Sequence, residues 1–353
     1  MKPWLVILAA AVVAAGAALT SAGCTRMARG PGEAGIADAK QSPYDVLAEA
    51  IRSGQPALES LAAETYLESD QPPPEGLLEP LANSPDPRVR FTAIAVLGTT
   101  RRAGLAPLFQ RCLRDGESVV RLASAFSLAQ SGDPSQVTAL RDGLASPDVT
   151  VRRSAAWLLG LMGNPTAASM LKTKLDDPDA VVVLRAAEAL ARLGSHDGLD
   201  EVRALTEHER HAVRYWATRL LGRIGTTADI PRLEKLCQSR FLDVKLAAIA
   251  AVAQQGDFKR IGLLVDLLDS PPSAEGESDV RVLASRELAE TGYTPAVERL
   301  AVLMARGDLT ERTSAAAAII RIRSARQSWR SHILAERPRP EAPAAATPLP
   351  AAR

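Results

Sequence analysis

The stretch DPRVRFTAIAVLGTTR, residues 86–101, contains the pattern that decides the fold. Val89, Ala93 and Leu97 are four residues apart, so they lie on one face of a helix. Asp86 stands three residues before Val89, where a carboxylate suits the N-terminus of that helix. The small Ala93 side chain allows a second helix to approach closely. The stretch therefore predicts a short helix that packs against neighbours on its Val–Ala–Leu face.

The same pattern returns nine times along the chain. The reference residues of the nine copies are Leu58, Val89, Val120, Val151, Val182, Val213, Val244, Val280 and Glu311. Seven of the eight steps between them are 31 residues, and the step from Val244 to Val280 is 36. A fixed period in this range is typical of a solenoid, in which stacked units bury one another's apolar faces.

Each unit contains a first helix before the helix that carries the reference residue. Apolar residues 11 and 7 positions before the reference residue indicate it, as in the pairs Leu47/Ile51, Leu140/Leu144, Leu171/Leu175 and Leu233/Cys237. Glycine stands twelve positions after six reference residues, namely Gly132, Gly163, Gly194, Gly225, Gly256 and Gly292. We expect these glycines to end the second helices in the left-handed conformation, which costs glycine no strain. Arg101 occupies this position in the repeat of Val89.

The segments Asp86-Pro87-Arg88-Val89-Arg90 and Val151-Arg152-Arg153-Ser154-Ala155-Ala156 resemble the HEAT-like repeat family, especially the short form named after phycobilisome lyases. The resemblance covers about residues 44–323. It implies an all-α, right-handed α-solenoid of about nine stacked two-helix repeats. With roughly 10 Å of helix packing per repeat, we expect a curved rod on the order of 90 Å long. Trp329, Ile333 and Leu334 predict one further helix that caps its open end.

The N-terminus predicts export. A short basic start precedes an apolar run at residues 4–19, and Ala22 and Gly23 place small side chains before Cys24. This pattern resembles a bacterial lipoprotein signal, which implies a diacylglycerol on Cys24 and a place in the cell envelope. Thr25 after the cysteine slightly favours the outer membrane by the same resemblance. An uncleaved single-helix anchor and ordinary signal cleavage are the alternatives.

These observations divide the chain into four segments. We predict a signal peptide at 1–23, a lipidated cysteine with a flexible tether at 24–43, the repeat solenoid with its terminal cap helix at 44–335, and a disordered Pro/Ala-rich tail at 336–353. The net charge of +1 offers no bulk attraction to nucleic acid. Cys112 and Cys237 lie four units apart, beyond the reach of a disulfide, and are interpreted as buried apolar residues.

An apolar strip is predicted along the concave side of the solenoid. It is formed by residues two positions after the reference residues, with aromatic residues beside them. The candidate protein-binding residues are Phe91, Leu122, Phe126, Trp157, Tyr215, Trp216 and Leu246. Aromatic side chains dominate interface energetics, so this strip could receive a helix or peptide of a partner protein. The alternative is that these side chains pack between neighbouring second helices.

A basic column is the most regular polar feature. It follows the reference residues by one position, at Arg90, Arg121, Arg152, Arg214, Lys245, Arg281 and Arg312. Acidic residues precede the reference residues by three positions, at Asp86, Glu117, Asp148, Asp179 and Asp308. The column is either a stripe for an acidic partner or an internal ladder, in which each cation bonds to an acid in the turn of its own or the adjacent unit.

No catalytic constellation and no metal or cofactor site is predicted. His208-Glu209-Arg210-His211 holds the only histidine cluster, which could bind a metal or form a polar turn. Deoxyhypusine hydroxylase, a relative of the fold, uses several His-Glu pairs, and only one is present here. Ser270 to Asp279 holds a five-residue insertion in one turn, either neutral or part of a binding face.

The sequence therefore predicts an exported, membrane-tethered scaffold that binds an unidentified protein, with no nucleic-acid partner and no small-molecule substrate. A HEAT-like enzyme of the lyase or hydroxylase type, or an enzyme accessory factor, is the alternative.

Overall fold

The computed structural model describes residues 41–271 and 279–324. Within these ranges the regular structure consists of seventeen α-helices and short 3₁₀ segments, without β-strands. The predicted all-α solenoid is therefore confirmed. Cys24 and its signal, residues 272–278 of the insertion segment 270–279, the cap helix and the C-terminal tail lie outside the described residues, so their predictions stay predictions.

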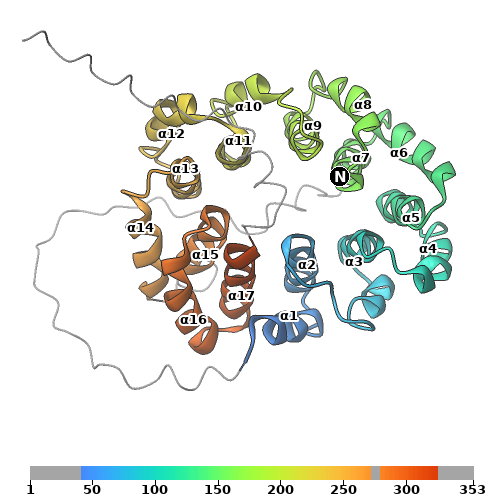
Figure 1. Ribbon diagram of the computed structural model, residues 1–353, viewed down its shortest axis with the longest axis horizontal. Helices are drawn as coiled ribbons and strands as arrows, with labels where there is room; N and C mark the ends of the chain where they lie inside the picture. The colour runs from blue at the N-terminus through green and yellow to red at the C-terminus, as the bar shows by residue number, and fades with distance from the viewer. Residues whose placement is uncertain (1–40, 272–278, 325–353) are drawn as a thin grey trace, which may run out of the picture.

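The helices form two concentric layers (Figure 1). The inner layer holds the second helix of every repeat: α2 (Pro56–Thr65), α3 (Pro87–Thr99), α5 (Ser118–Gln130), α7 (Val149–Met162), α9 (Ala180–Arg192), α11 (His211–Ile224), α13 (Leu242–Gln254), α15 (Val280–Thr291) and α17 (Leu309–Ser324). The outer layer holds α1 (Pro43–Ile51), α4 (Ala106–Cys112), α6 (Val137–Leu144), α8 (Ala168–Lys172), α10 (Leu199–Leu205), α12 (Ile230–Leu236), α14 (Ile261–Asp266) and α16 (Val297–Arg306). In the second repeat a 3₁₀ segment, Glu79–Asn83, takes the outer place.

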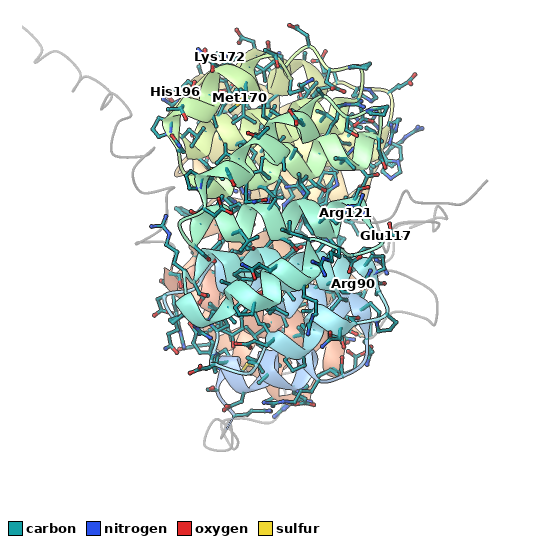
Figure 2. The ribbon with its side chains drawn as sticks, turned by 90° about the vertical axis from the view of Figure 1, so that its right-hand side faces the viewer. Arg90, Glu117, Arg121, Met170, Lys172 and His196 are labelled. Atoms are coloured by element: carbon teal, nitrogen blue, oxygen red, sulfur yellow. The ribbon has the colours of Figure 1, made fainter. Side chains whose placement is uncertain are left out.

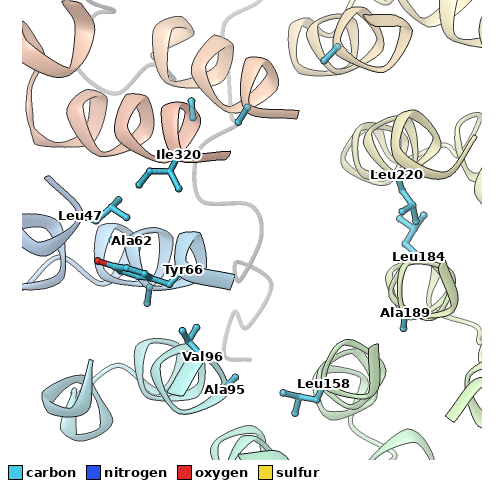
Figure 3. Packing of buried hydrophobic residues seen from close by; sticks show 14 of the residues in the cluster. Leu47, Ala62, Tyr66, Ala95, Val96, Leu158, Leu184, Ala189, Leu220 and Ile320 are labelled. Atoms are coloured by element: carbon cyan, nitrogen blue, oxygen red, sulfur yellow. The ribbon is translucent and has the colours of Figure 1, made fainter. Parts of the chain in front are cut away.

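The solenoid closes into a ring, which corrects the expectation of a rod. Helix α17 packs against α1 and α2, so the last repeat contacts the first (Figure 1). At this seam Ile320 points toward Leu47 and Ala62, and all three side chains are buried (Figure 3). Arg312 donates hydrogen bonds to Glu49 at 2.7 and 3.0 Å. The open end for which the sequence predicts a cap is thus covered by the first repeat.

Small residues in the inner layer explain the strong curvature. Gly160 of α7 lies so close to Ala189 of α9 that an added Cβ would stand 2.8 Å from the Ala189 Cα. Gly222 of α11 stands in the same relation to Ala251 of α13, again at 2.8 Å. Such contacts draw the inner helices together while the outer helices stay apart, so each repeat is a wedge. Nine wedges that close one turn rotate by about 40° each.

This packing has a period of two repeats. Glycine stands nine positions after the reference residue in alternate repeats, and Gly98, Gly160 and Gly222 are 62 residues apart. In the repeats between them the position is alanine, and the facing residues are the small Ser127, Ala189 and Ala251. The structural unit of the central ring is therefore a pair of repeats.

The predicted helix ends are largely confirmed. Asp86, Asp148 and Asp179 accept hydrogen bonds from backbone N–H groups as N-caps. Five of the six predicted glycines have positive φ, including Gly163 at 68°. Gly225 is the exception, with φ −68° and ψ 176°, because the chain leaves α11 in an extended conformation. Arg101 adopts the left-handed conformation without being glycine, at φ 52°.

The residues that the four-residue spacing predicted to be buried form part of the core. Ala155 and Leu159, four and eight positions after Val151, are fully buried, as are Ala93 and Leu97. Both described cysteines, Cys112 and Cys237, are buried and free. Within residues 41–271 and 279–324, none of the helices combines the length and apolarity that crossing a membrane requires.

Candidate functional site

The predicted concave strip lies along the inner layer, and most of it is covered. Phe126 and Leu246 are fully buried, and Leu122 and Tyr215 are 6% and 5% exposed. These four side chains are covered by the surrounding helices, and Leu122 packs beside Gly143 of the outer helix α6. They can contact a partner only if the ring opens.

The other three strip residues keep part of their surface in solvent. Phe91 of α3, Trp157 of α7 and Trp216 of α11 are half-buried. The Phe91 and Trp157 rings lie 5.6 Å apart, so they meet across α5. Trp216 contacts the Tyr215 ring edge-on at 4.9 Å, and the Arg219 guanidinium lies 5.1 Å from its ring centre. The strip is therefore discontinuous, with two separate partly exposed aromatic sites.

A buried ionic network spans the interior of the ring, and the sequence reasoning missed it. Glu290 of α15 accepts hydrogen bonds from Arg219 and Arg223 of α11, each at 2.8 Å. Arg223 also donates to Glu188 of α9 at 2.8 Å. Tyr215 adds a second link across α13 by donating to the carboxylate of Glu287 at 2.7 Å. The contacts between α11 and α15 join inner helices that are not neighbours in the ring, because α13 lies between them.

The network reaches the seam through α17. Arg321 lies 3.5 Å from the Glu68 carboxylate of the first repeat and 4.0 Å from that of Glu290. The carboxylate of Glu290 is 1% exposed and that of Glu287 is fully buried. Burial of unpaired charges is costly, so the closed ring depends on these partners staying together.

The surroundings of Glu188 hold its carboxylate ionised. Burial raises the pKa of Glu188, but the positive charges of Arg185, Arg192 and Arg223 outweigh it and lower that pKa to about 2. A carboxylate with such a pKa is a poor general base at neutral pH, and arginine does not release its proton. The ion pairs of Glu188 with Arg185 and Arg223 therefore serve to position α9 and α11.

A comparison of equivalent positions in the nine repeats would have revealed this network. Its residues stand mainly six, seven and ten positions after the reference residues, on the helix face that meets the interior. At these positions the chain has Glu188, Arg192, Arg219, Arg223, Glu287, Glu290 and Arg321. The apolar stripe at positions zero, four and eight gives no hint of them.

The basic column forms a ladder, as the second interpretation predicted. Arg90 donates two hydrogen bonds to Asp115 of the next turn at 2.8 and 2.9 Å, and Arg152 does the same to Asp177 at 2.9 and 3.0 Å. Each arginine also donates to carbonyls of its own turn, as Arg90 does to Ser84. The acid partners stand five positions before the next reference residue. Most of the acids that stand three positions before a reference residue cap helices instead. Figure 2 shows Arg90 and Arg121 along one edge of the ring.

The ladder lacks its acid between α11 and α13, as it does between α5 and α7, where Ser146 takes the position of Asp115 and Asp177. Arg214 donates to its own turn at the His208 and Glu209 carbonyls, but the residue that corresponds to Asp115 and Asp177 is Ser239. The Ser239 hydroxyl accepts from the Phe241 backbone N–H at 3.2 Å, as Asp177 accepts from that of Asp179 at 3.0 Å. Serine thus keeps the turn and loses the charge.

The capping acids are also missing at this edge. Arg210 and Phe241 stand three positions before the reference residues Val213 and Val244. Neither caps its helix through its side chain. We define the edge cluster by its residues, which are Arg210, His211, Arg214, Arg240, Phe241 and Leu242. The cluster is the most basic and aromatic departure from the repeat pattern among the described turns.

The histidine cluster contributes to this edge and does not assemble a metal site. His211 stacks on Phe241 with ring centres 4.8 Å apart, while His208 accepts from the Arg210 backbone N–H at 3.1 Å. In the part of the chain that the structure describes, no three His, Cys, Asp or Glu side chains are grouped closely enough to hold a metal ion.

A family model described as HEAT repeats matches this chain in five overlapping stretches, residues 74–157, 105–190, 137–218, 171–253 and 202–279. Together they span more than half of its 353 residues. No curated protein matches the sequence.

Three solved structures are similar to the chain. The X-ray structure of YibA of Escherichia coli is 16% identical, with a TM-score of 0.38, 73% of this chain covered and 94% of that one. The CpcE–CpcF complex of phycocyanin lyase from Nostoc is 22% identical, with a TM-score of 0.31 and coverages of 69% and 96%. Human deoxyhypusine hydroxylase in complex with glycerol is 18% identical, with a TM-score of 0.31 and coverages of 76% and 99%.

Proposed function

This chain belongs to the HEAT-repeat family, and we propose that it is an exported, lipid-anchored scaffold that binds another protein. The observation that carries the proposal is the partly exposed aromatic surface of Phe91, Trp157 and Trp216 on a closed ring. Aromatic residues with accessible surface are favoured binding positions. A ring held by internal ion pairs loses little conformational entropy when a partner binds.

The cellular location in this proposal comes from the N-terminal sequence. A diacylglycerol on Cys24 would hold the ring at a membrane of the cell envelope, and residues 25–42 would act as the tether. A random coil of this length reaches roughly 25 Å on average. Replacing Cys24 by serine should release the protein from the membrane fraction and abolish labelling by a radioactive fatty acid. Labelling that persists in the variant would contradict lipidation at this residue.

The partner is tested by photo-crosslinking in cells that express the full chain. The photoreactive residue p-benzoylphenylalanine replaces Trp157 or Trp216 in separate variants and, as a matched control, Lys172 on the outer helix α8 (Figure 2). We expect the two inner-helix positions to capture the same protein and the outer position to capture none of it. Capture from Lys172 alone, or no capture at any position, would count against the proposal.

A lyase- or hydroxylase-type enzyme is the second candidate from the sequence, and no contact between described residues favours it. The same purified full-length protein provides its test. A tightly bound chromophore or stoichiometric metal, detected by absorbance and elemental analysis, would replace the scaffold proposal by the enzyme.

A further inference from the structure

We infer that the edge cluster binds an acidic segment of a protein partner, an inference that rests on the proposed scaffold function and names a docking surface for it. The cluster lies where α11 and α13 begin, at the edge that carries the arginine ladder in the preceding repeats. At the edges of Arg90 and Arg152 an acid pairs with the cation of the ladder. At the edge of Arg121 the corresponding residue is Ser146, but Asp148 still caps the following helix. Here the acids are replaced by Arg210, Ser239 and Phe241.

The arginines of the edge cluster have no carboxylate partner among the described residues. Arg210 and Arg240 are exposed and Arg214 is half-buried, and none of them forms an ion pair there. Glu209 and Asp243 are the acids nearest in sequence. The Asp243 carboxylate is buried and accepts from the Val244 backbone N–H at 2.8 Å, so it is engaged elsewhere. Arg214 uses its Nη1 for the His208 and Glu209 carbonyls, but among the described residues no carboxylate neutralises any of the three guanidinium groups.

Phe241 gathers two of these cations, Arg214 and Arg240, around one ring. The guanidinium carbons of Arg214 and Arg240 lie 5.0 and 4.8 Å from its centre, within the range of cation–π attraction. His211 stacks on the same ring at an angle of 8° between the planes. A ring covered in this way holds the arginines in place and offers little free face for stacking a nucleic-acid base. Fixed guanidinium forks match the geometry of carboxylates, which they bind through paired hydrogen bonds.

Leu242 adds an apolar contact beside the cations. Its side chain is 44% exposed, one of few large apolar side chains in the described residues with such exposure. A segment that fits the whole cluster therefore carries glutamate or aspartate next to a bulky apolar residue. This composition distinguishes an acidic protein segment from the bare phosphates of a nucleic acid.

The inference is tested by fluorescence anisotropy with the full chain and a short labelled peptide rich in Glu, Asp and Leu. We expect saturable binding that weakens by tenfold or more when the ionic strength rises from about 0.1 to about 1 M, because the Debye length falls from about 10 to about 3 Å. The double variant Arg214→Gln/Arg240→Gln should bind at least tenfold more weakly. As a matched control, Arg111→Gln/Arg141→Gln removes the same charge from outer helices α4 and α6 and should change the affinity less than twofold.

Ser239→Asp provides a test that does not remove any arginine. The new carboxylate should pair with Arg214 as Asp177 pairs with Arg152, and this internal partner should weaken peptide binding severalfold. A helical spectrum and an unchanged thermal midpoint, or a raised one, would show that the variant is folded. Unaltered affinity in both this variant and the double arginine variant would overturn the inference, as would failure of the peptide to bind the wild type.

Two further probes separate the partner classes. Vesicles containing phosphatidylglycerol and a single-stranded DNA are offered to the same variants. Preferential binding of either probe, lost with Arg214 and Arg240, would replace the acidic segment by a membrane or nucleic-acid ligand. If photo-crosslinking at Trp157 and Trp216 still captures a partner while the peptide fails, the scaffold function stands and only the edge inference falls.

Discussion

The repeat pair of α7 and α9 and the pair of α11 and α13 are built on the same packing but carry different charges at one edge. Gly160 meets Ala189 in the first pair as Gly222 meets Ala251 in the second. Arg152 binds Asp177 in the first pair, whereas Arg214 faces Ser239 in the second. Stacking thus requires the small residues in both pairs but tolerates loss of the ion pair, so the edge is free to serve another purpose.

The shared packing gives the largest expected effect. Gly160→Ala and Gly222→Ala should each destabilise the ring by about 1–3 kcal/mol, because the new Cβ would force two inner helices apart. Gly262→Ala on α14 is the control, since a Cβ there meets no atom within 4 Å and a gain of about 0.5–1 kcal/mol is expected. Urea unfolding measures all three. If Gly222→Ala left the free energy of unfolding unchanged, the packing in the two repeat pairs would not be equivalent.

Removing the ion pair from the first repeat pair makes it resemble the second. Asp177→Ser should cost about 2 kcal/mol, because the side chains of Arg152 and Asp177 are only 13% and 4% exposed and the cation loses its partner. Serine preserves the turn, as Ser239 does, so the loss reports on charge alone. The double variant Arg152→Gln/Asp177→Ser closes a cycle that gives the coupling energy. Additive losses would mean that the pair is energetically irrelevant.

The Arg152–Asp177 pair also makes the stability of the first repeat pair depend on pH. Burial raises the pKa of Asp177, but hydrogen bonds from Arg152 and the Asp179 backbone N–H outweigh it, so the pKa lies below its usual value. The pair therefore stabilises the fold fully above the unfolded-state pKa of about 3.9, and this contribution is lost as the pH falls through the folded value. The stability difference between wild type and Asp177→Ser should be constant near neutrality and shrink below about pH 4. Urea unfolding at several pH values measures it, and a constant difference down to pH 2 would contradict the assignment.

The turn at Arg101 extends the comparison to a third repeat pair, formed by α3 and α5. Arg101→Gly should stabilise the ring by about 0.5–1 kcal/mol, because glycine adopts the observed φ of 52° without strain. Gly163→Ala at the matching turn should destabilise it by a similar amount, since a Cβ finds open space there and only the positive φ of 68° opposes it. Thermal midpoints measure both changes. Equal midpoints for all three proteins would show that these turns carry no strain.

The smallest effect is expected from giving the second pair the charge that it lacks. Ser239→Asp should stabilise the ring by up to about 1 kcal/mol through the half-buried Arg214. The gain should vanish when Arg214 is replaced by glutamine. A gain that survives this replacement would mean that the new carboxylate acts on the start of α13 and not on Arg214.

The sequence predicted the local structure well because local structure depends on near neighbours. The spacing of Val151, Ala155 and Leu159 identified the buried face, and Gly163 identified the turn after it. Ring closure was not predictable in this way, because a few degrees of rotation per repeat, accumulated nine times, separate an open solenoid from a closed one. That rotation depends on contacts such as Gly160 with Ala189, which lie in different repeats and appear only when repeats are compared in pairs.

The candidate site shows the same limit. The strip residues from Phe91 to Leu246 lie on inner-layer helices, but how much of their surface stays exposed is a property of the curvature. The interior network was missed because Glu188 and Glu290 gain their partners from other repeats, and Arg223 binds both. The edge cluster was visible in the sequence as two successive repeats with Arg210 and Phe241 at the position where the four repeats before them have an acid.

Closure gives every repeat two neighbours, and this changes how the molecule should come apart. In an open array the terminal units have one interface each and fray first. In the ring, α17 is held by α15 on one side and by α1 and α2 on the other, so no unit is a natural starting point for unfolding. The first rupture must break an internal interface, after which two free ends exist and the rest can unravel from both. Unfolding should therefore be more cooperative than in an open array of the same length, with the seam and the interior ion pairs setting the barrier.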